Sequence, residues 1–171
     1  MKQADIAIVM GSDSDLPQLE AGIRLLQDFG VPFIVEVSSA HRTPERTVEL
    51  VKDFENAGGK VIIAAAGGAA HLPGVISGHT RLPVLGVPVP SALDGLDSLL
   101  AMVQMPAGIP TAAFGIGKSG GTNAVLFALQ ILALESPELD EKIVAYREEQ
   151  RRGVETKSRR LQKKVEGLWK S

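Results

Sequence analysis

The sequence contains no cysteine and few aromatic residues, and both absences narrow the functions it can have. Its 171 residues include no Cys, five Phe, one Trp and one Tyr. Without cysteine, the chain cannot form disulfides, thiolate zinc sites, iron–sulfur clusters or a cysteine nucleophile. The shortage of aromatic side chains also argues against a surface that stacks nucleic-acid bases, so we expect no nucleic-acid partner.

A long apolar run is missing as well. The longest one, residues 124–134, is interrupted by Gln130 and is shorter than the roughly 18 residues that a membrane span needs. The apolar residues 6–10 follow Asp5 and do not form a signal peptide. These features predict a cytoplasmic protein with no membrane partner.

The rest of the composition is that of an ordinary globular chain, with 44% hydrophobic residues, 22% charged residues and 18 Gly. The length fits one domain, because domains usually have about 100–200 residues. We therefore predict a single domain over residues 1–171, with a core at about 4–135 and a C-terminal helix at about 137–168.

The charge is unevenly distributed along the chain. Residues 147–171 contain nine Lys or Arg and four Glu, a local charge of +5, whereas residues 1–146 contain nine basic and 16 acidic residues, a local charge of −7. A basic segment of this kind is either a patch for nucleic acid or membrane or, more often, the solvated face of a helix.

Short β-branched runs alternate with helical patterns, which is typical of βαβ units around a parallel sheet. Residues 61–66 are apolar without a break, as expected of a central parallel strand. Thr43 and Pro44 have the residue types of an N-cap and a first helical position. The pattern predicts an α/β fold with five strands, at residues 6–10, 33–37, 61–66, 84–87 and 111–116.

Ligands of open α/β sheets bind outside the carboxyl ends of the strands, so the loops after the strands are the candidate site. The first of these loops contains Ser12 and Asp15 ahead of a helix. Free backbone N–H groups and the helix dipole favour an anion such as phosphate there, and the Asp15 carboxylate could accept from sugar hydroxyls. The alternative is plain N-capping, because Ser and Asp are preferred caps.

The second and third loops contain two of the three histidines. His41 and Arg42 combine a proton-transfer group with a permanent cation suited to phosphate, although a surface loop can hold both by chance. His71, in the glycine-rich third loop, either contacts a ligand or bonds a backbone carbonyl, and His79 is expected on the surface. The three histidines lack a close metal-ligand spacing, so we expect no metal site.

Residues 115–120, Gly-Ile-Gly-Lys-Ser-Gly, have the glycine spacing of a dinucleotide-binding loop and nearly match a phosphate-binding loop. No strand is expected after the following helix, and Ala112 occupies the first glycine of the phosphate-binding pattern. Both interpretations are therefore disfavoured.

Five ordered motifs together resemble the 5-(carboxyamino)imidazole ribonucleotide mutases of de novo purine synthesis, in the aminoimidazole ribonucleotide carboxylase family. The motifs are VMGSDSD (9–15), SAHRTP (39–44), GGAAHLPG (67–74), GVP (86–88) and VQMP (103–106). The resemblance implies a flavodoxin-like, three-layer α/β/α sandwich that forms a homo-octamer and uses no metal or organic cofactor. It also implies that Ser12, Asp15, Arg42 and His71 bind the phosphoribosyl imidazole substrate.

The implied reaction moves a carboxylate from the exocyclic nitrogen to a ring carbon, giving 5-amino-4-carboxyimidazole ribonucleotide. His41 would protonate the departing amine and later remove the proton from the ring carbon, while residues 67–74 enclose carbon dioxide. Two alternatives stay open: direct carboxylation of aminoimidazole ribonucleotide by carbon dioxide, and a non-catalytic phosphate-binding module. The chain departs from the family at Ala65, where a glycine is usual; alanine would be strained there at positive φ but suits the end of a strand.

Overall fold

The computed structural model describes residues 3–169 and contains one sheet of five parallel strands. The strand order is β2-β1-β3-β4-β5, in which β1 and β3 are neighbours although β2 lies between them in the sequence. This order is that of the flavodoxin-like fold and confirms the predicted fold class. The strands are β1 (Ile6–Met10), β2 (Phe33–Val37), β3 (Val61–Gly67), β4 (Val84–Val89) and β5 (Ala112–Ala113).

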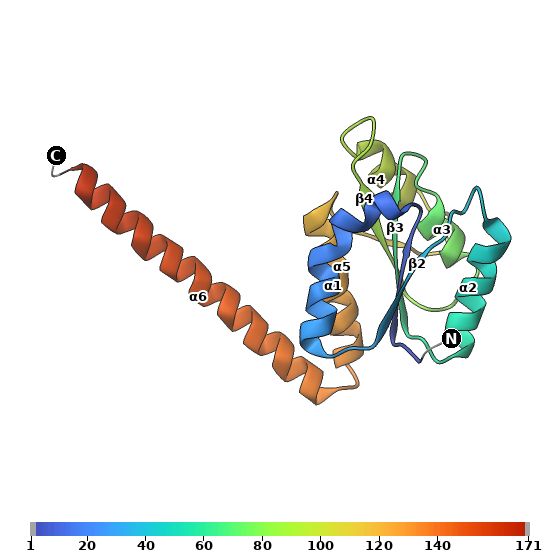
Figure 1. Ribbon diagram of the computed structural model, residues 1–171, viewed down its shortest axis with the longest axis horizontal. Helices are drawn as coiled ribbons and strands as arrows, with labels where there is room; N and C mark the ends of the chain where they lie inside the picture. Colours follow the sequence, from blue (N-terminus) through green and yellow to red (C-terminus); the bar gives the residue numbers. More distant parts are fainter. Residues whose placement is uncertain (1–2, 170–171) are drawn as a thin grey trace. The chain divides into compact units, whose positions relative to one another are not determined.

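Helices cover both faces of the sheet (Figure 1). One face is covered by α1 and α5, which approach so closely that a Cβ added at Gly22 would lie 2.7 Å from Cγ2 of Val125. The other face is covered by α2 and α3, which gives the predicted three layers. The helices that precede α6 in the chain are η1 (Asp13–Asp15), α1 (Leu16–Phe29), α2 (Pro44–Asn56), α3 (Leu72–Ser77), α4 (Leu96–Val103) and α5 (Lys118–Ala133).

The core lies around β1, β3 and β4, whose side chains are almost all buried. Phe54 of α2 and Met102 of α4 belong to one buried cluster with Ala64 of β3. Ala65 is fully buried within β3 and pairs with Met10 and Val87. This pairing confirms the expectation that Ala65 belongs to the strand. Alanine is unstrained there, because an extended residue does not need the positive φ that glycine allows.

Two parts of the predicted secondary structure differ from the structure. The predicted strand 111–116 is reduced to Ala112–Ala113, because only these residues pair in register with β4 and, within residues 3–169, no strand covers the other side of β5. The loop expected after β3 contains the short helix α3, which begins after His71 and has Pro73 in its first turn. Proline is favoured there because its missing N–H has no helical partner to lose.

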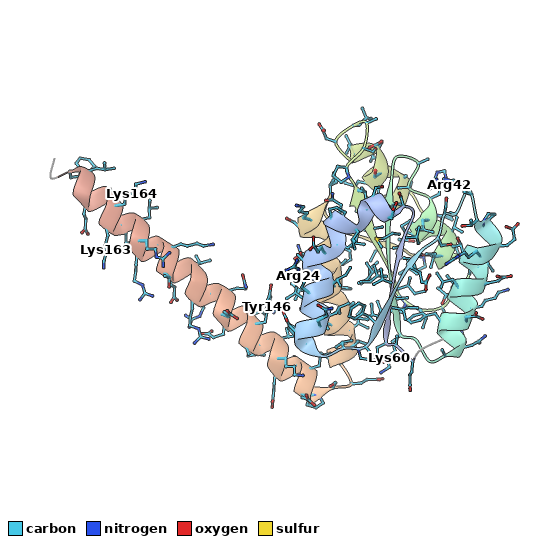
Figure 2. The ribbon with its side chains drawn as sticks, in the orientation of Figure 1. Arg24, Arg42, Lys60, Tyr146, Lys163 and Lys164 are labelled. Atoms are coloured by element: carbon cyan, nitrogen blue, oxygen red, sulfur yellow. The ribbon has the colours of Figure 1, made fainter. Side chains whose placement is uncertain are left out.

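The chain divides into two compact units, one up to Ile131 and one from Leu132 onward. The second unit consists mainly of α6 (Pro137–Leu168), which begins and ends where the sequence predicts a helix. Ser136 caps it by accepting a hydrogen bond from the Leu139 N–H at 3.4 Å. Figure 2 shows Lys163 and Lys164 near the end of this helix, in the basic segment. None of the helices within residues 3–169 has the length and apolar character needed to span a bilayer.

Candidate active site

A cavity of about 350 Å³ lies at the carboxyl ends of β1, β2 and β3. This is the switch point of the sheet, where the chain leaves neighbouring strands β1 and β3 in opposite directions and opens a crevice. Figure 2 shows Arg42 at this end of the sheet and Lys60 at the opposite end. All five predicted site residues line the cavity. The complete lining is Gly11, Ser12, Asp15, Ser39, Ala40, His41, Arg42, Ala66, Gly67, Ala69, His71 and Leu72.

Ser12 and Asp15 cap η1 and also face the cavity. The Ser12 N–H donates to Oδ2 of Asp15 at 3.1 Å, and Oγ of Ser12 accepts from the Ser14 N–H at 3.3 Å. These reciprocal bonds form a capping box. The capping alternative is therefore correct. The Asp15 carboxylate keeps acceptor capacity for a ligand, whereas Oγ of Ser12 also accepts from Oγ of Ser14 at 2.8 Å and donates to Oδ1 of Asp13 at 3.2 Å, so it binds a ligand by exchanging one of these bonds.

Asp15 is a buried carboxyl, with 7% of its surface exposed. Burial raises the pKa of Asp15 above its ordinary value, and the negative charge of Asp13 acts in the same direction. The hydrogen bond from the Ser12 N–H opposes this shift by stabilising the carboxylate. Asp15 is thus a poorly hydrated acceptor at the floor of the cavity, and a hydroxyl donor would satisfy it.

Arg42 brings a positive charge to the cavity without an acidic partner among residues 3–169. Its Nη2 donates to the Gly11 carbonyl at 3.2 Å and its Nε to Oγ of Ser39 at 3.4 Å. Both acceptors are neutral, so these bonds fix the direction of the guanidinium and leave its charge uncompensated. A guanidinium in this state is suited to a phosphate or carboxylate.

His41 and His71 are joined by a hydrogen bond of 2.8 Å between Nε2 of His41 and Nδ1 of His71. The ring centroids are 4.9 Å apart and the ring planes are nearly perpendicular, at 83°. One of the two nitrogens must carry the proton and the other must accept it, so the bond couples the tautomers of the rings. It breaks when both facing nitrogens are protonated. The pair therefore shares one proton between the rings, in the cavity that Arg42 also lines.

Ser39 is a lining residue that was not among the predicted site residues. Its Oγ accepts from both the backbone N–H and Nε of Arg42, at 3.2 Å and 3.4 Å. The spacing of three residues between a serine and an arginine after a strand is the signal that could have identified it. Ser39 and Arg42 also line an adjoining cavity of about 390 Å³, which contains Arg46. Arg46 forms an ion pair with Glu36 at 3.1 Å, so its charge, unlike that of Arg42, is balanced.

The AIR carboxylase family matches residues 5–153. The chain belongs to this family. It is 53% identical over 158 residues to an N5-carboxyaminoimidazole ribonucleotide mutase of Pyrococcus horikoshii, covering 92% of this chain and 88% of the relative. The protein of the same name from Thermotoga maritima is 47% identical over 158 residues, 92% of this chain and 91% of the relative. The crystal structure of Treponema denticola PurE has a TM-score of 0.79 and 29% identity, covering 87% of this chain and 92% of that one.

In this AIR carboxylase family member, the glycine-rich segment at the start of α5 is explained by packing. A Cβ at Gly120 would lie 1.5 Å from the Gly115 carbonyl oxygen, and one at Gly121 would lie 2.2 Å from the Gln18 carbonyl oxygen. Glycine is thus required where α5 begins because backbones meet there.

His79 is exposed and does not line the cavity. Across residues 3–169, no three His, Asp or Glu side chains gather as a metal site requires.

Proposed function

We propose that this chain is an N5-carboxyaminoimidazole ribonucleotide mutase of purine synthesis, converting the N-carboxylated ribonucleotide into 5-amino-4-carboxyimidazole ribonucleotide. Curated relatives whose sequences are about 50% identical to this chain have that name. The observation that carries the chemistry is the convergence of a hydrogen-bonded histidine pair and an uncompensated guanidinium in one cavity. This combination offers one exchangeable proton and one anion site.

Arg42 and Ser12 take the substrate phosphate in this proposal. Arg42 supports this role because its two side-chain bonds go to neutral acceptors and leave its charge for an anion. Asp15 takes a ribose hydroxyl. Its burial supports this role, because a carboxylate that water reaches poorly gains more from an incoming hydrogen-bond donor. The sugar phosphate then points the imidazole toward His41.

His41 acts as acid and then as base. The bond between the exocyclic nitrogen and the carboxyl carbon breaks and releases carbon dioxide within the cavity, while His41 gives its proton to the nitrogen. Carbon dioxide then forms a bond to the ring carbon, and His41 removes the proton displaced from that carbon. The histidine returns to its starting state, as one group serving both steps must. His71 supports this cycle by holding the His41 ring through the 2.8 Å bond.

We further propose that the chain is one cytoplasmic domain that assembles as a homo-octamer and binds neither nucleic acid nor membrane. The family match at residues 5–153 supports one domain, because it crosses the boundary between the two compact units. Assembly is supported by an apolar stripe along α4 and the loop before it: Leu93, Leu96, Leu100 and Val103 are 64%, 50%, 49% and 49% exposed. Such a stripe is favoured on a surface that another subunit covers. Light scattering measures the number of subunits.

The test is an assay with the N-carboxylated ribonucleotide, following the C-carboxylated product in wild type and His41→Asn. The mutase proposal predicts that His41→Asn binds substrate and transfers no carboxylate. A wild type that accepts only aminoimidazole ribonucleotide, at a rate dependent on bicarbonate, would instead be a direct carboxylase. A variant turning over at the wild-type rate would contradict the role of His41, and binding without turnover in wild type would indicate a non-catalytic module.

A further inference from the structure

Beside the cavity, the backbone N–H of Gly68 is held by two serine hydroxyls, one from the loop after β4 and one from α4. It donates to Oγ of Ser98 at 2.9 Å and to Oγ of Ser91 at 3.2 Å. Each hydroxyl uses its own proton elsewhere: Ser98 donates to the Val89 carbonyl at 2.8 Å, and Ser91 donates to Oδ2 of Asp97. Because both hydroxyl protons are committed, the lone pairs of both oxygens face the same N–H.

The peptide held in this way joins two residues of the cavity wall. Gly67 and Ala69 line the cavity on either side of Gly68, which has a positive φ of 65°. A planar trans peptide directs its N–H and C=O in opposite directions, so fixing the Gly68 N–H also fixes the carbonyl of Gly67. The bonds to Ser91 and Ser98 therefore set the backbone surface that a substrate meets at Gly67.

The two carboxylate oxygens of Asp97 differ: Oδ2 accepts from the Ser91 hydroxyl. Its Oδ1 is buried and has no hydrogen-bond partner within residues 3–169. The hydrogen bond from Ser91 nevertheless lowers the pKa of Asp97, and the backbone N–H groups of Ser98, Asp97 and Leu93 act in the same direction. The first turn of α4 also favours an acid through the helix dipole, so Asp97 is held as the ionised acceptor of the Ser91 hydroxyl.

We propose that Asp97 is a positioning residue for the carboxylate transfer, acting through Ser91 to hold the Gly67–Gly68 peptide against the substrate. This inference rests on the mutase function proposed above. In a productive turnover, carbon dioxide leaves the nitrogen, adds to the ring carbon and displaces a proton that His41 accepts. Carbon dioxide is uncharged and small, so the shape of the wall retains it. A displaced wall lets it escape, leaving aminoimidazole ribonucleotide whose amine keeps the proton taken from His41, which recovers one from solvent.

The experiment measures how the N-carboxylated substrate divides between C-carboxylated product and released aminoimidazole ribonucleotide, after subtracting the rate without enzyme. Asp97→Asn weakens the acceptor for Ser91, and Ser91→Ala removes the bridge while leaving the Asp97 charge in place. For both variants we expect kcat to fall about 10-fold or more, with KM changing less than about 2-fold and released aminoimidazole ribonucleotide rising relative to product. Ser91→Thr keeps the hydroxyl and should restore the wild-type division.

The matched control is Asp94→Asn, which removes an exposed acid from the loop between β4 and α4 that also contains Ser91. Asp94 has φ 53°, a conformation that asparagine tolerates, so this variant should behave as wild type. Thermal unfolding of each variant monitors the fold, and Ser91→Ala decides the question if Asp97→Asn does not fold. An unchanged division of products in Ser91→Ala, or a fall in thermal stability alone, overturns the positioning role. A wild type that makes no C-carboxylated product overturns the proposed function and this inference together.

Discussion

Replacing Asp15 with asparagine separates ligand binding from helix capping at one position. The amide oxygen of asparagine can still accept the Ser12 N–H, which Oδ2 of Asp15 accepts at 3.1 Å. Asparagine at this place therefore preserves the capping box and removes the negative charge. If the carboxylate accepts a ribose hydroxyl, the lost bond to a charged group is worth about 1.5–3 kcal/mol, or about a 10- to 150-fold rise in Kd.

The effect on stability has the opposite direction. Burial raises the pKa of Asp15 above 3.8 in the folded chain, so the folded state binds this proton more tightly than the unfolded state does. The ionised carboxyl consequently lowers stability above the raised pKa, and stability is gained as the pH falls through that pKa toward 3.8. We expect Asp15→Asn to unfold at the same temperature as wild type or a higher one at pH 7. The difference should shrink as the pH falls through the raised pKa.

Two measurements check these expectations. Calorimetric titration with aminoimidazole ribonucleotide at pH 7 gives Kd, and thermal unfolding between pH 4 and pH 7 gives the stability difference. The control is Asp28→Asn, which removes an exposed acid from α1 and should change neither quantity. An unchanged Kd for Asp15→Asn would remove the carboxylate from the ribose site. A large loss of thermal stability at pH 7 would show that its charge stabilises the fold, which contradicts the burial argument.

Two further substitutions test the anion site and the packing of α5. Arg42→Ala should weaken binding of the ribonucleotide about 100-fold or more, because the charge-assisted contact with the phosphate is lost. The control is Arg24→Ala, because the Arg24 guanidinium pairs with Glu20 on the surface. The control should leave the Kd measured by titration unchanged. Gly120→Ala should lower the free energy of unfolding by about 1–3 kcal/mol or more, since its Cβ would lie 1.5 Å from the Gly115 oxygen. Gly153 lies on the open surface of α6, so Gly153→Ala should instead raise the free energy of unfolding by up to about 1 kcal/mol. Denaturant unfolding measures both variants, and equal effects of Gly120→Ala and Gly153→Ala would contradict the packing argument.

The fold could be predicted from local pattern because its central strands are continuous apolar runs. Residues 61–66 are buried between β1 and β4, and this run has the length of a strand and is shorter than a typical buried helix. Prediction failed where pairing geometry decides: only Ala112 and Ala113 pair in register with β4, and after them the N–H groups of Phe114 and Gly117 make single bonds to the Gly86 and Pro88 carbonyls, which composition does not reveal. Helix α3 was missed because its six residues are too few to show a periodic pattern.

The candidate site divides in the same way. Ser12, His41 and His71 could be assigned to one edge because each follows a strand of a parallel sheet. The bond between His41 and His71 links residues 30 positions apart, and the contacts of Ser91 and Ser98 with Gly68 span 23 and 30 positions. Such pairs depend on how helices lie against strands, and no local spacing in a single sequence encodes them.

The unsatisfied polar groups of the first unit are unevenly placed in the sheet. At the edge opposite the cavity, where β1 and β3 begin, Lys60 is paired with Asp5 at 3.4 Å. At the carboxyl edge, the Arg42 charge has neutral partners, Asp15 is buried with a raised pKa, and Oδ1 of Asp97 has no partner within residues 3–169. Of these, the buried Asp15 carboxylate lowers the stability of the fold, because burial disfavours its charge. The buried strands β1, β3 and β4 supply the stability that tolerates it, and a ligand that is anionic at one end and rich in hydroxyls beside it would meet both the exposed Arg42 guanidinium and Asp15.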